Sequence, residues 1–503
     1  MTQCHLTLLS SFMLLLLACS GGSDDDTTSS PGLGGQTALG GGPMAGSAGS
    51  IGAGGSATGG APSDMGGASS AAGGTTATGG AGSAGDAGFA GATAVGGAAA
   101  AGGGAGFPAS GGSTSVEVDP DALFVAPDGS PGASGTIDDP TTLADAVVRV
   151  NAGETIYVRG GTYAFGSPIS VSRSGTDGSP ITLSVYPLDS TRPRFDFSAM
   201  SESSSNRGVS LSGDYWHVHG LDLYWAGDNC MFVSGSNNII ESSTFSECAD
   251  TGLQLGNGAA SNLILNCDSY FNADSTLENA DGFAAKLDVG TGNRFVGCRA
   301  WNNLDDGWDG YLRLADDVTT TYENCWAIDN GKLMDGSVGV GDGNGFKTGG
   351  SDGKDLRHNA VYTQCIAAGN VHDGFDHNSN RGSVTILNCA AHDNGSNISF
   401  GTTNIAASLT IKNTTSLGSN GELNATSTDI ASNSWQDGLS ATADDFISVD
   451  TALLKSPRQS DGSLPDIDYL RLVPGSDLGN AGVDVGLPYN GSAPDIGPFE
   501  SDE

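Results

Sequence analysis

Basic residues are scarce in this sequence. Its 503 residues include 57 acidic and 19 basic side chains, so the formal net charge is −38 at pH 7. A surface with so few cations cannot hold nucleic acid or an anionic membrane by charge, and we therefore expect no nucleic-acid partner. An anionic substrate would need a metal ion between itself and the protein.

Cysteine is also sparse, and the apolar run near the start of the chain is short. Nine cysteines in 503 residues are too few for a disulfide scaffold. No Cys-x-x-Cys pair is matched by a second Cys or His pair, which argues against a zinc site. The run from Leu6 to Ala18 has about 13 residues, too few to cross a bilayer but typical of the core of an export signal.

The end of this run, Leu16-Leu17-Ala18-Cys19, resembles the lipobox of bacterial lipoproteins, in which the signal is cut before the cysteine and the cysteine carries the lipid. The resemblance implies a signal peptide over residues 1–18 and an outer-membrane or cell-surface protein that touches the membrane only through the lipid on Cys19. A plain secretory signal, giving an extracellular protein, is the alternative. The first basic residue is Arg149, so the usual positive start of an export signal is missing.

Large side chains are almost absent from residues 20–115, which consist mainly of Gly, Ala, Ser and Thr. Such a segment cannot bury enough apolar surface to offset its chain entropy, so we predict a disordered, flexible linker. The 80 glycines of the chain, about twice the usual share, likewise exclude one compact fold throughout. The predicted organisation is a signal over 1–18, the anchor cysteine and linker over 19–115, and one folded domain over 116–503.

The folded domain contains an irregular repeat. A cysteine is followed five residues later by an asparagine, and the spacings between successive cysteines are 31, 27, 40 and 24 residues. This indicates a unit of about 24 residues with variable insertions. The series extends to Thr415 and Asn420, with threonine in the cysteine position, and its members are Cys267/Asn272, Cys298/Asn303, Cys325/Asn330, Cys365/Asn370 and Cys389/Asn394.

Short β-rich segments with Gly, Asn and Asp at the corners predict an all-β fold, a single-stranded parallel β-helix. Equal positions of successive turns then stack into columns about 4.8 Å apart. We expect the cysteines to form a column of small buried thiols, with an occasional disulfide, and the asparagine amides to hydrogen-bond from turn to turn. A leucine-rich repeat is the main rival, but its leucine spacing is missing.

A second repeated element combines an acidic or amide residue, a glycine and an aromatic residue. We expect the aromatic side chain to point inward and the next residue outward, which places Ala284, Asp309, Lys347 and Asp376 in one outer column. Asp281, Asp305 and Asp306 would then gather beside Asp309, so four carboxylates converge on one patch. Hard oxygen ligands in that number suit calcium. The elements are Asp281-Gly282-Phe283, Asp306-Gly307-Trp308, Asn344-Gly345-Phe346 and Asp373-Gly374-Phe375.

These segments carry a family resemblance. The stretch from Asn279 to Lys286, the stretch from Asn302 to Asp309, and Gly343 to Lys347 together resemble the signature of family 9 polysaccharide lyases, pectate lyases with a right-handed parallel β-helix. The resemblance implies that a calcium ion is bound by four aspartates and that one lysine is the Brønsted base. The aspartates are Asp281, Asp305, Asp306 and Asp309, and the lysine is Lys347.

The expected reaction is β-elimination on polygalacturonate, in which calcium neutralises the uronate carboxylate and Lys347 removes the proton on C5. One alternative is a polygalacturonase-type hydrolase, which also uses consecutive aspartates such as Asp305-Asp306, although its Gly-His-Gly and Arg-Ile-Lys elements are missing. The others are elimination on another uronan, such as rhamnogalacturonan, alginate or a glycosaminoglycan, and a non-catalytic glycan-binding surface protein. We expect a monomer.

Several further residues are candidates around the site. Lys286 is better explained by a structural salt bridge than by a base role. Arginines are the expected partners of substrate carboxylates because the guanidinium offers two parallel donors. These candidates are Arg294, Arg299, Arg313 and Arg381. Large aromatic residues could stack on sugars, but in a β-helix they are more often packed inside; they are Trp225, Trp301 and Trp326.

Overall fold

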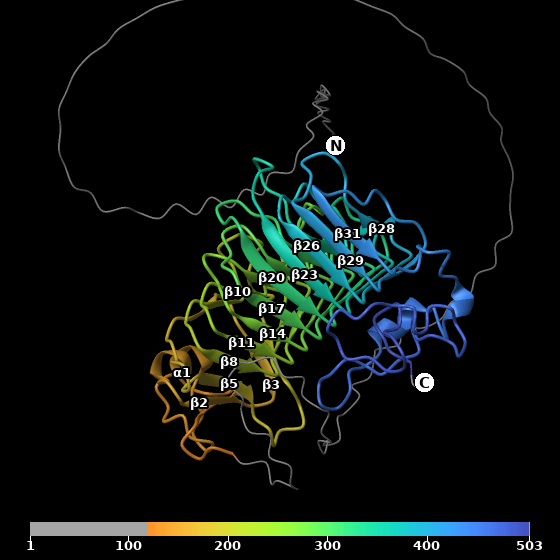
Figure 1. Cartoon of the computed structure of the whole chain (residues 1–503). Coiled ribbons are helices and arrows are strands. Elements are labelled where there is room, and N and C mark those ends of the chain that lie inside the picture. The colour runs from red at the N-terminus through yellow and green to blue at the C-terminus, as the bar shows by residue number, and fades with distance from the viewer. Residues whose placement is uncertain (1–117, 502–503) are drawn as a thin grey trace, which may run out of the picture. The chain divides into compact units, whose positions relative to one another are not determined.

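The computed structural model describes residues 118–501, so the predicted signal peptide, Cys19 and the whole of the predicted linker lie outside the described residues. The described chain winds into three sheets of parallel strands (Figure 1). Each complete turn contributes one strand to each sheet, as β14, β15 and β16 do. The predicted single-stranded parallel β-helix is therefore confirmed. Within this range no helix has both the length and the apolar composition needed to cross a membrane.

The largest sheet, called sheet 1, has twelve strands. Its strands alternate between buried and more accessible side chains, as in β23, which is the pattern of a strand with one face in a core. They are β1 (Leu123–Val125), β2 (Thr155–Val158), β5 (Ile181–Val185), β8 (Trp216–His219), β11 (Ile239–Glu241), β14 (Leu263–Leu265), β17 (Asn293–Val296), β20 (Val318–Glu323), β23 (His358–Thr363), β26 (Ser383–Leu387), β29 (Ser408–Lys412) and β31 (Ser427–Ala431).

Sheet 2 has nine strands and sheet 3 has ten. Sheet 2 comprises β4 (Ile169–Val171), β7 (Val209–Leu211), β10 (Met231–Val233), β13 (Leu253–Leu255), β16 (Phe283–Ala285), β19 (Trp308–Asp309), β22 (Phe346–Lys347), β25 (Asp373–Asp376) and β28 (Ser396–Ser399). Sheet 3 comprises β3 (Gly161–Ala164), β6 (Pro193–Asp196), β9 (Asp222–Tyr224), β12 (Thr244–Ser246), β15 (Asp268–Tyr270), β18 (Arg299–Trp301), β21 (Trp326–Ile328), β24 (Ile366–Ala368), β27 (Ala390–His392) and β30 (Thr415–Leu417).

Aromatic rings fill the interior between sheets 1 and 2. From sheet 2, the ring centroids of Phe283, Trp308, Phe346 and Phe375 follow one another at 5.1, 4.9 and 5.0 Å in stacked geometry. All four side chains are fully buried, so the predicted inward direction of these aromatic residues is confirmed. Stacked rings of this kind add to the stability that their buried area alone provides.

Two further columns run through the interior as predicted. Five free cysteines, from Cys267 to Cys389, are buried. The asparagine amides form a ladder in which, for example, Asn303 Nδ2 donates to Asn330 Oδ1 at 3.0 Å and Asn330 Nδ2 donates to Asn370 Oδ1 at 2.9 Å. The ladder satisfies polar groups that the turns would otherwise bury without partners.

The predicted extension of these columns to Thr415 and Asn420 is wrong by one residue. Thr415 pairs with Ala390, so Thr414 takes the position that corresponds to Cys389. Asn420 is not part of the ladder, which ends when Asn394 Nδ2 donates to Asn397 Oδ1 at 3.0 Å. The reason is that Asn413 and Thr414 align with Asn388 and Cys389, as the Asn413 to Asn388 side-chain hydrogen bond shows.

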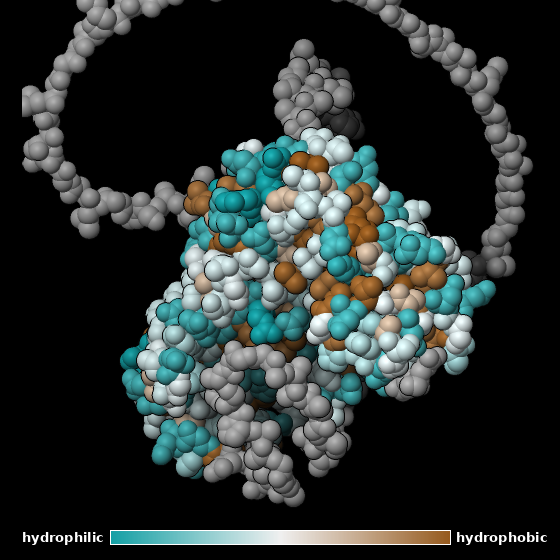
Figure 2. Space-filling model, viewed as in Figure 1, coloured by the Kyte–Doolittle hydropathy of each residue, from teal (hydrophilic) through white to brown (hydrophobic). Residues whose placement is uncertain are grey.

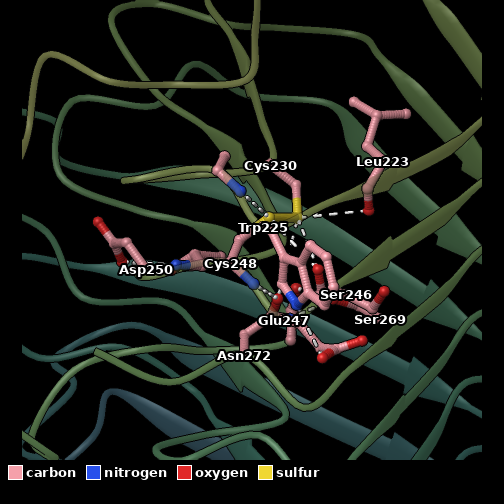
Figure 3. Close-up of a disulfide and its surroundings, with 12 residues drawn as sticks. Leu223, Trp225, Cys230, Ser246, Glu247, Cys248, Asp250, Ser269 and Asn272 are labelled. Atoms are coloured by element: carbon pink, nitrogen blue, oxygen red, sulfur yellow. Dashed lines mark hydrogen bonds between the residues drawn. A yellow bond between two sulfur atoms is a disulfide. The ribbon is translucent and has the colours of Figure 1, made fainter. Parts of the chain in front are cut away.

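A disulfide between Cys230 and Cys248 closes the other end of the ladder (Figure 3). Cys248 occupies the ladder position in its turn, because its backbone N–H donates to Asn272 Oδ1 at 3.0 Å. This is the single disulfide among the cysteines of residues 118–501, and it agrees with the expectation of an occasional bridge.

Other elements cover the first turns of the β-helix and the outer face of sheet 3. Helix α1 (Leu143–Arg149) buries Leu143, Ala146 and Val147 and packs on strands β1, β2 and β4 at the first turns. The segment after β31 includes the short 3-10 helices η1 (Ala443–Asp445) and η2 (Thr451–Lys455) and lies against the outer face of sheet 3. Figure 2 shows hydrophobic residues grouped near this segment on an otherwise mostly polar face.

Candidate active site

The candidate site lies on the outer face of sheet 2. Ala284 pairs with Asp309, Asp309 with Lys347, and Lys347 with Asp376. The predicted outer column is therefore confirmed. Its strands are only two to four residues long, and the connections that follow sheet 3 bring in the remaining acidic side chains.

Three of the four predicted aspartates form a tight cluster. One carboxylate oxygen of each of Asp281, Asp305 and Asp306 lies within 4.8 Å of the others. Asp309 is linked to them by Lys286, whose Nζ lies 3.0 Å from Asp281 Oδ2 and 3.4 Å from Asp309 Oδ2. Lys286 thus makes the structural salt bridge that the sequence indicated, and it does so inside the site.

Loops and neighbouring turns fix the orientation of these carboxylates. Thr251 Oγ1 donates to Asp281 Oδ2 at 2.9 Å, and the backbone N–H of Asn344 donates to Asp306 Oδ1 at 2.8 Å. The backbone N–H of Asp342 donates to Asp305 Oδ1. Each of these carboxylates is therefore held by a donor on one side, which is how a protein pre-orients ligands.

Lys347 lies among the acidic groups and is 8% exposed. Its Nζ is 2.9 Å from Asp342 Oδ2, 3.2 Å from Asp306 Oδ2 and 3.8 Å from Asp309 Oδ1. Burial lowers the pKa of Lys347, but the surrounding carboxylates, Asp309 foremost, outweigh it and raise the pKa well above its usual value. Without another cation the amine is held in its ammonium form.

The pKa values of the four aspartates shift in different directions. Burial raises the pKa of Asp281 to about 6 and raises the pKa of Asp305 and Asp306 well above the usual range. For Asp309, burial acts in the same direction, but the charges of Lys347 and Lys286 lower its pKa overall. Two lysines therefore do not supply enough positive charge for all four carboxylates to ionise readily.

The cluster fits a calcium ion. Asp306 Oδ2 is buried and accepts no hydrogen bond, although Lys347 Nζ is close. Several convergent carboxylate oxygens match the hard, oxygen-rich coordination that calcium prefers, and a divalent ion would relieve their mutual repulsion. The residues that would hold it are Asp281, Asp305, Asp306 and Asp309.

Sequence reasoning placed Asn344 in the repeated element without giving it a role in the site, and it missed Asp342 altogether. Asp342 precedes the Asn344-Gly345-Phe346 element by two residues, in the long connection between β21 and β22. That connection meets the loop after β15, where Val340 N–H donates to the Leu277 carbonyl at 3.0 Å. A variable insertion has no fixed position in the repeat, so its spacing gave no signal for Asp342.

The candidate arginines do not all lie on the face of the β-helix that carries the site. Arg294 forms an exposed ion pair with Glu323 on sheet 1, and Arg299 is buried on sheet 3, where it binds Asp268; neither lies on the face of the site. Arg313 follows β19 and lies 3.4 Å from Asp352, close to the site. The role of Arg381 in binding a substrate carboxylate stays a prediction.

The tryptophans differ from the expectation of interior packing. Trp326 belongs to the apolar cluster beneath the C-terminal segment, with Trp301 packed against it. Both side chains point out of the β-helix, because the neighbouring alanine on the same strand points inward. This neighbour is Ala300 for Trp301 on β18 and Ala327 for Trp326 on β21. Trp225 is 44% exposed, and its indole N–H donates to Glu247.

Comparison with known proteins agrees with this fold. Residues 123–416 match the protein family described as "Pel9A-like, right handed beta helix region", which confirms the predicted handedness. Together these findings define the chain as a polysaccharide lyase of the right-handed parallel β-helix class.

The similarity extends to individual relatives. Pectate lyase L of Dickeya dadantii is 38% identical over 393 residues, which cover 75% of this chain and 90% of that protein. The crystal structure of pectate lyase Pel9A superposes with a TM-score of 0.69 at 37% identity, covering 76% of this chain and 96% of that one. A rhamnogalacturonan lyase follows, with a TM-score of 0.64 at 26% identity, covering 71% and 97%. The chain belongs to the pectate lyase family.

Proposed function

We propose that this protein is a calcium-dependent pectate lyase that cleaves polygalacturonate by β-elimination and releases 4,5-unsaturated oligogalacturonides. The observation that carries the proposal is the convergence of Lys347 with Asp281, Asp305, Asp306 and Asp309 on one face of sheet 2. The named relatives support the reaction class.

The reaction must remove a weakly acidic proton beside an ionised carboxylate. Bound calcium would neutralise the uronate carboxylate and so stabilise the enolate-like transition state. Lys347 Nζ takes the proton from C5, the C4–O bond breaks, a double bond forms between C4 and C5, and the departing sugar oxygen gains a proton.

Lys347 can accept this proton only when it is neutral. The carboxylates that raise its pKa are in large part those assigned to the cation. Carboxylate charge that is engaged by a divalent ion no longer stabilises the ammonium, so loading of the acidic cluster and deprotonation of Lys347 are coupled. We therefore expect activity to rise toward alkaline pH and to depend on calcium for base activation as well as substrate binding.

The test is an assay of the full chain on polygalacturonate, followed by the ultraviolet absorbance of unsaturated products. We expect product with millimolar calcium and none with excess chelator. Lys347→Ala should reduce kcat at least about a hundredfold, the usual contribution of a general base. The matched control is Lys332→Ala, which removes an ammonium paired with Asp329 outside the acidic cluster. Full activity in chelator would refute the metal requirement, and unchanged turnover of Lys347→Ala would refute the base.

Rhamnogalacturonan is the second candidate substrate, because a rhamnogalacturonan lyase shares the fold at 26% identity. The same assay on rhamnogalacturonan separates the two polymers: the preferred one gives the higher kcat/KM. The family assignment sets aside the hydrolase and the non-catalytic alternatives.

We also propose that the chain is exported and anchored by a lipid on Cys19. The Cys230–Cys248 disulfide supports an oxidising compartment. Labelling of cells with radioactive palmitate should mark the wild-type chain in the membrane fraction and leave Cys19→Ser unlabelled. An unlabelled, released wild-type chain would favour the secretory alternative.

A further inference from the structure

A second cluster lies beside Lys347, and the proposed chemistry does not use it. Tyr311 follows Asp309 by two residues, and its backbone N–H donates to Asp309 Oδ1 at 2.9 Å. Its ring is partly exposed, unlike the buried aromatic rings of sheet 2. Lys347 Nζ and Lys354 Nζ lie 5.9 and 5.7 Å from the ring centroid, within the range of a cation–π contact. The Tyr311 ring therefore contacts both Lys347, the proposed base, and Lys354, which is exposed.

Asp352 ties this cluster together. The Tyr311 hydroxyl donates to Asp352 Oδ1 at 2.6 Å, and Arg313 Nε lies 3.4 Å from Asp352 Oδ2. The two loops belong to successive turns, since Leu312 forms a parallel bridge with Ser351. The phenol and the guanidinium are thus held at a fixed separation beside the acidic cluster.

The composition of the cluster suits a uronate unit. The chain has only 19 basic residues, yet Lys347 and Lys354 lie 5.9 and 5.7 Å from the Tyr311 ring centroid. A third, Arg313, is close to Asp352, which accepts the hydrogen bond of the Tyr311 hydroxyl. A local group of cations offsets the repulsion that a protein of net charge −38 otherwise exerts on a polyanion. Arginine and lysine bind carboxylates, and a partly exposed tyrosine offers an apolar face with a polar edge.

We propose that Tyr311, Arg313 and Lys354 form a uronate-binding subsite, which holds the sugar unit next to the one that loses its C5 proton. This inference rests on the proposed function. The Tyr311 and Lys354 turns are about 4.8 Å apart, a separation on the scale of one sugar ring. A merely structural cluster would instead affect stability and leave substrate affinity unchanged.

The first test separates KM from kcat. Arg313→Ala/Lys354→Ala should raise KM for polygalacturonate about tenfold, with kcat and the half-saturating calcium concentration within twofold of wild type. The matched control is Arg294→Ala/Lys412→Ala, which removes the same charges from ion pairs with Glu323 and Asp429 on sheet 1 and should leave KM unchanged. Tyr311→Phe, which keeps the ring, should raise KM less than Tyr311→Ala.

The second test measures binding without cleavage. In the Lys347→Ala background with calcium, electrophoresis through gels containing polygalacturonate should retard the parent and the control pair, and should retard Arg313→Ala/Lys354→Ala less. An active wild type whose subsite variants match the control in both tests would overturn the subsite alone. A wild type that makes no unsaturated product from polygalacturonate would overturn the proposed function and the subsite with it.

Discussion

Two lysines of the site differ in what lies around them. Lys286 bridges Asp281 and Asp309, both of which are buried. Lys347 also contacts buried acids, Asp306 and Asp309, but in addition it contacts Asp342, whose side chain is 58% exposed and lies on a long loop. An amine that must collect a proton and release it needs such a route to solvent, whereas a counterion does not. The surroundings therefore separate the proposed base from the structural lysine.

Asp306→Asn tests the calcium assignment at a single residue. The amide keeps an oxygen for the Asn344 N–H, but it replaces the charged Oδ2, which accepts no hydrogen bond. We expect the half-saturating calcium concentration to rise at least about tenfold, measured by calorimetric titration of the protein with calcium and by activity. Asp316→Asn, in an exposed ion pair with Arg357, is the control. An unaltered calcium affinity in Asp306→Asn would remove Asp306 from the ligand set.

The residues of this site were predictable where the repeat fixes their place. Asp309 and Lys347 follow inward aromatic residues, so strand alternation alone placed them in one outer column. The number of converging carboxylates suggested calcium, whereas the family resemblance supplied the ligand assignment and the base role of Lys347, because spacing shows proximity and not a role in catalysis. Tyr311 and Asp342 escaped prediction because they stand in loops, where neither alternation nor register applies.

At the scale of structural elements, the asparagine ladder joins each turn to the next. Asn330 illustrates the arrangement: its Nδ2 donates to Asn370, and its Oδ1 accepts from Asn303. Because every ladder residue serves both neighbours, removing one leaves polar groups of two other turns without partners.

Asn330→Ala should therefore lower the free energy of unfolding by about 3 kcal/mol, the cost of several buried polar groups that lose their partners. Thermal unfolding followed by circular dichroism measures the effect. Asn151→Ala, at an exposed asparagine that bonds only to nearby Glu154 among the contacts described, should change the midpoint little. Equal midpoints for the two variants would show that the ladder does not stabilise the fold.

The buried side chain of His358, in strand β23, makes the stability of the fold depend on pH. It is buried, its Nδ1–H donates to the Gly310 carbonyl at 2.7 Å, and its Nε2 lies 2.8 Å from Thr320 Oγ1. Burial lowers its pKa, so the unfolded chain, with a histidine pKa near 6.5, binds a proton that the folded chain does not. This contribution to stability is present above about pH 6.5 and is lost as the pH falls below it.

The experiment compares urea unfolding of wild type and His358→Gln at pH 7.5 and 5.5. The stability advantage of wild type should shrink by about 1 kcal/mol at the lower pH. A difference between variants is needed because burial raises the pKa of Asp281 to about 6 and of Asp376 to about 7, which changes stability in the opposite direction. His372→Gln, at an exposed histidine, is the control; a pH-independent difference for His358→Gln would contradict the assignment.

For the described chain as a whole, the repeat predicted the β-helix but not the C-terminal segment that packs on it. The cysteine and asparagine columns indicated a parallel β-helix, and only their last members were misplaced, at Thr415 and Asn420, where one residue shifts the register. The C-terminal segment has no repeat, so its packing on sheet 3 could not be predicted. That packing explains why Trp326 is buried outside the coil.

Arg458 anchors this segment to the β-helix. Its guanidinium donates to Asp268 Oδ1 at 2.7 Å, to the Cys267 carbonyl at 3.0 Å and to the Gly297 carbonyl at 2.9 Å. Asp268 is also bound by Arg299, so the acid lies between two arginines.

Arg458→Ala should lower the free energy of unfolding by about 3 kcal/mol, because it breaks a largely buried ion pair and removes a donor from the carbonyls of Cys267, Gly297 and Gly462. Limited proteolysis should then cut first within residues 432–501, while kcat of the undigested protein stays near wild type because the site lies on sheet 2. Arg357→Ala, which breaks an exposed pair with Asp316, should cost at most about 1 kcal/mol. If Arg458→Ala resists proteolysis as well as this control does, the segment is held by its apolar contacts and not by the arginine.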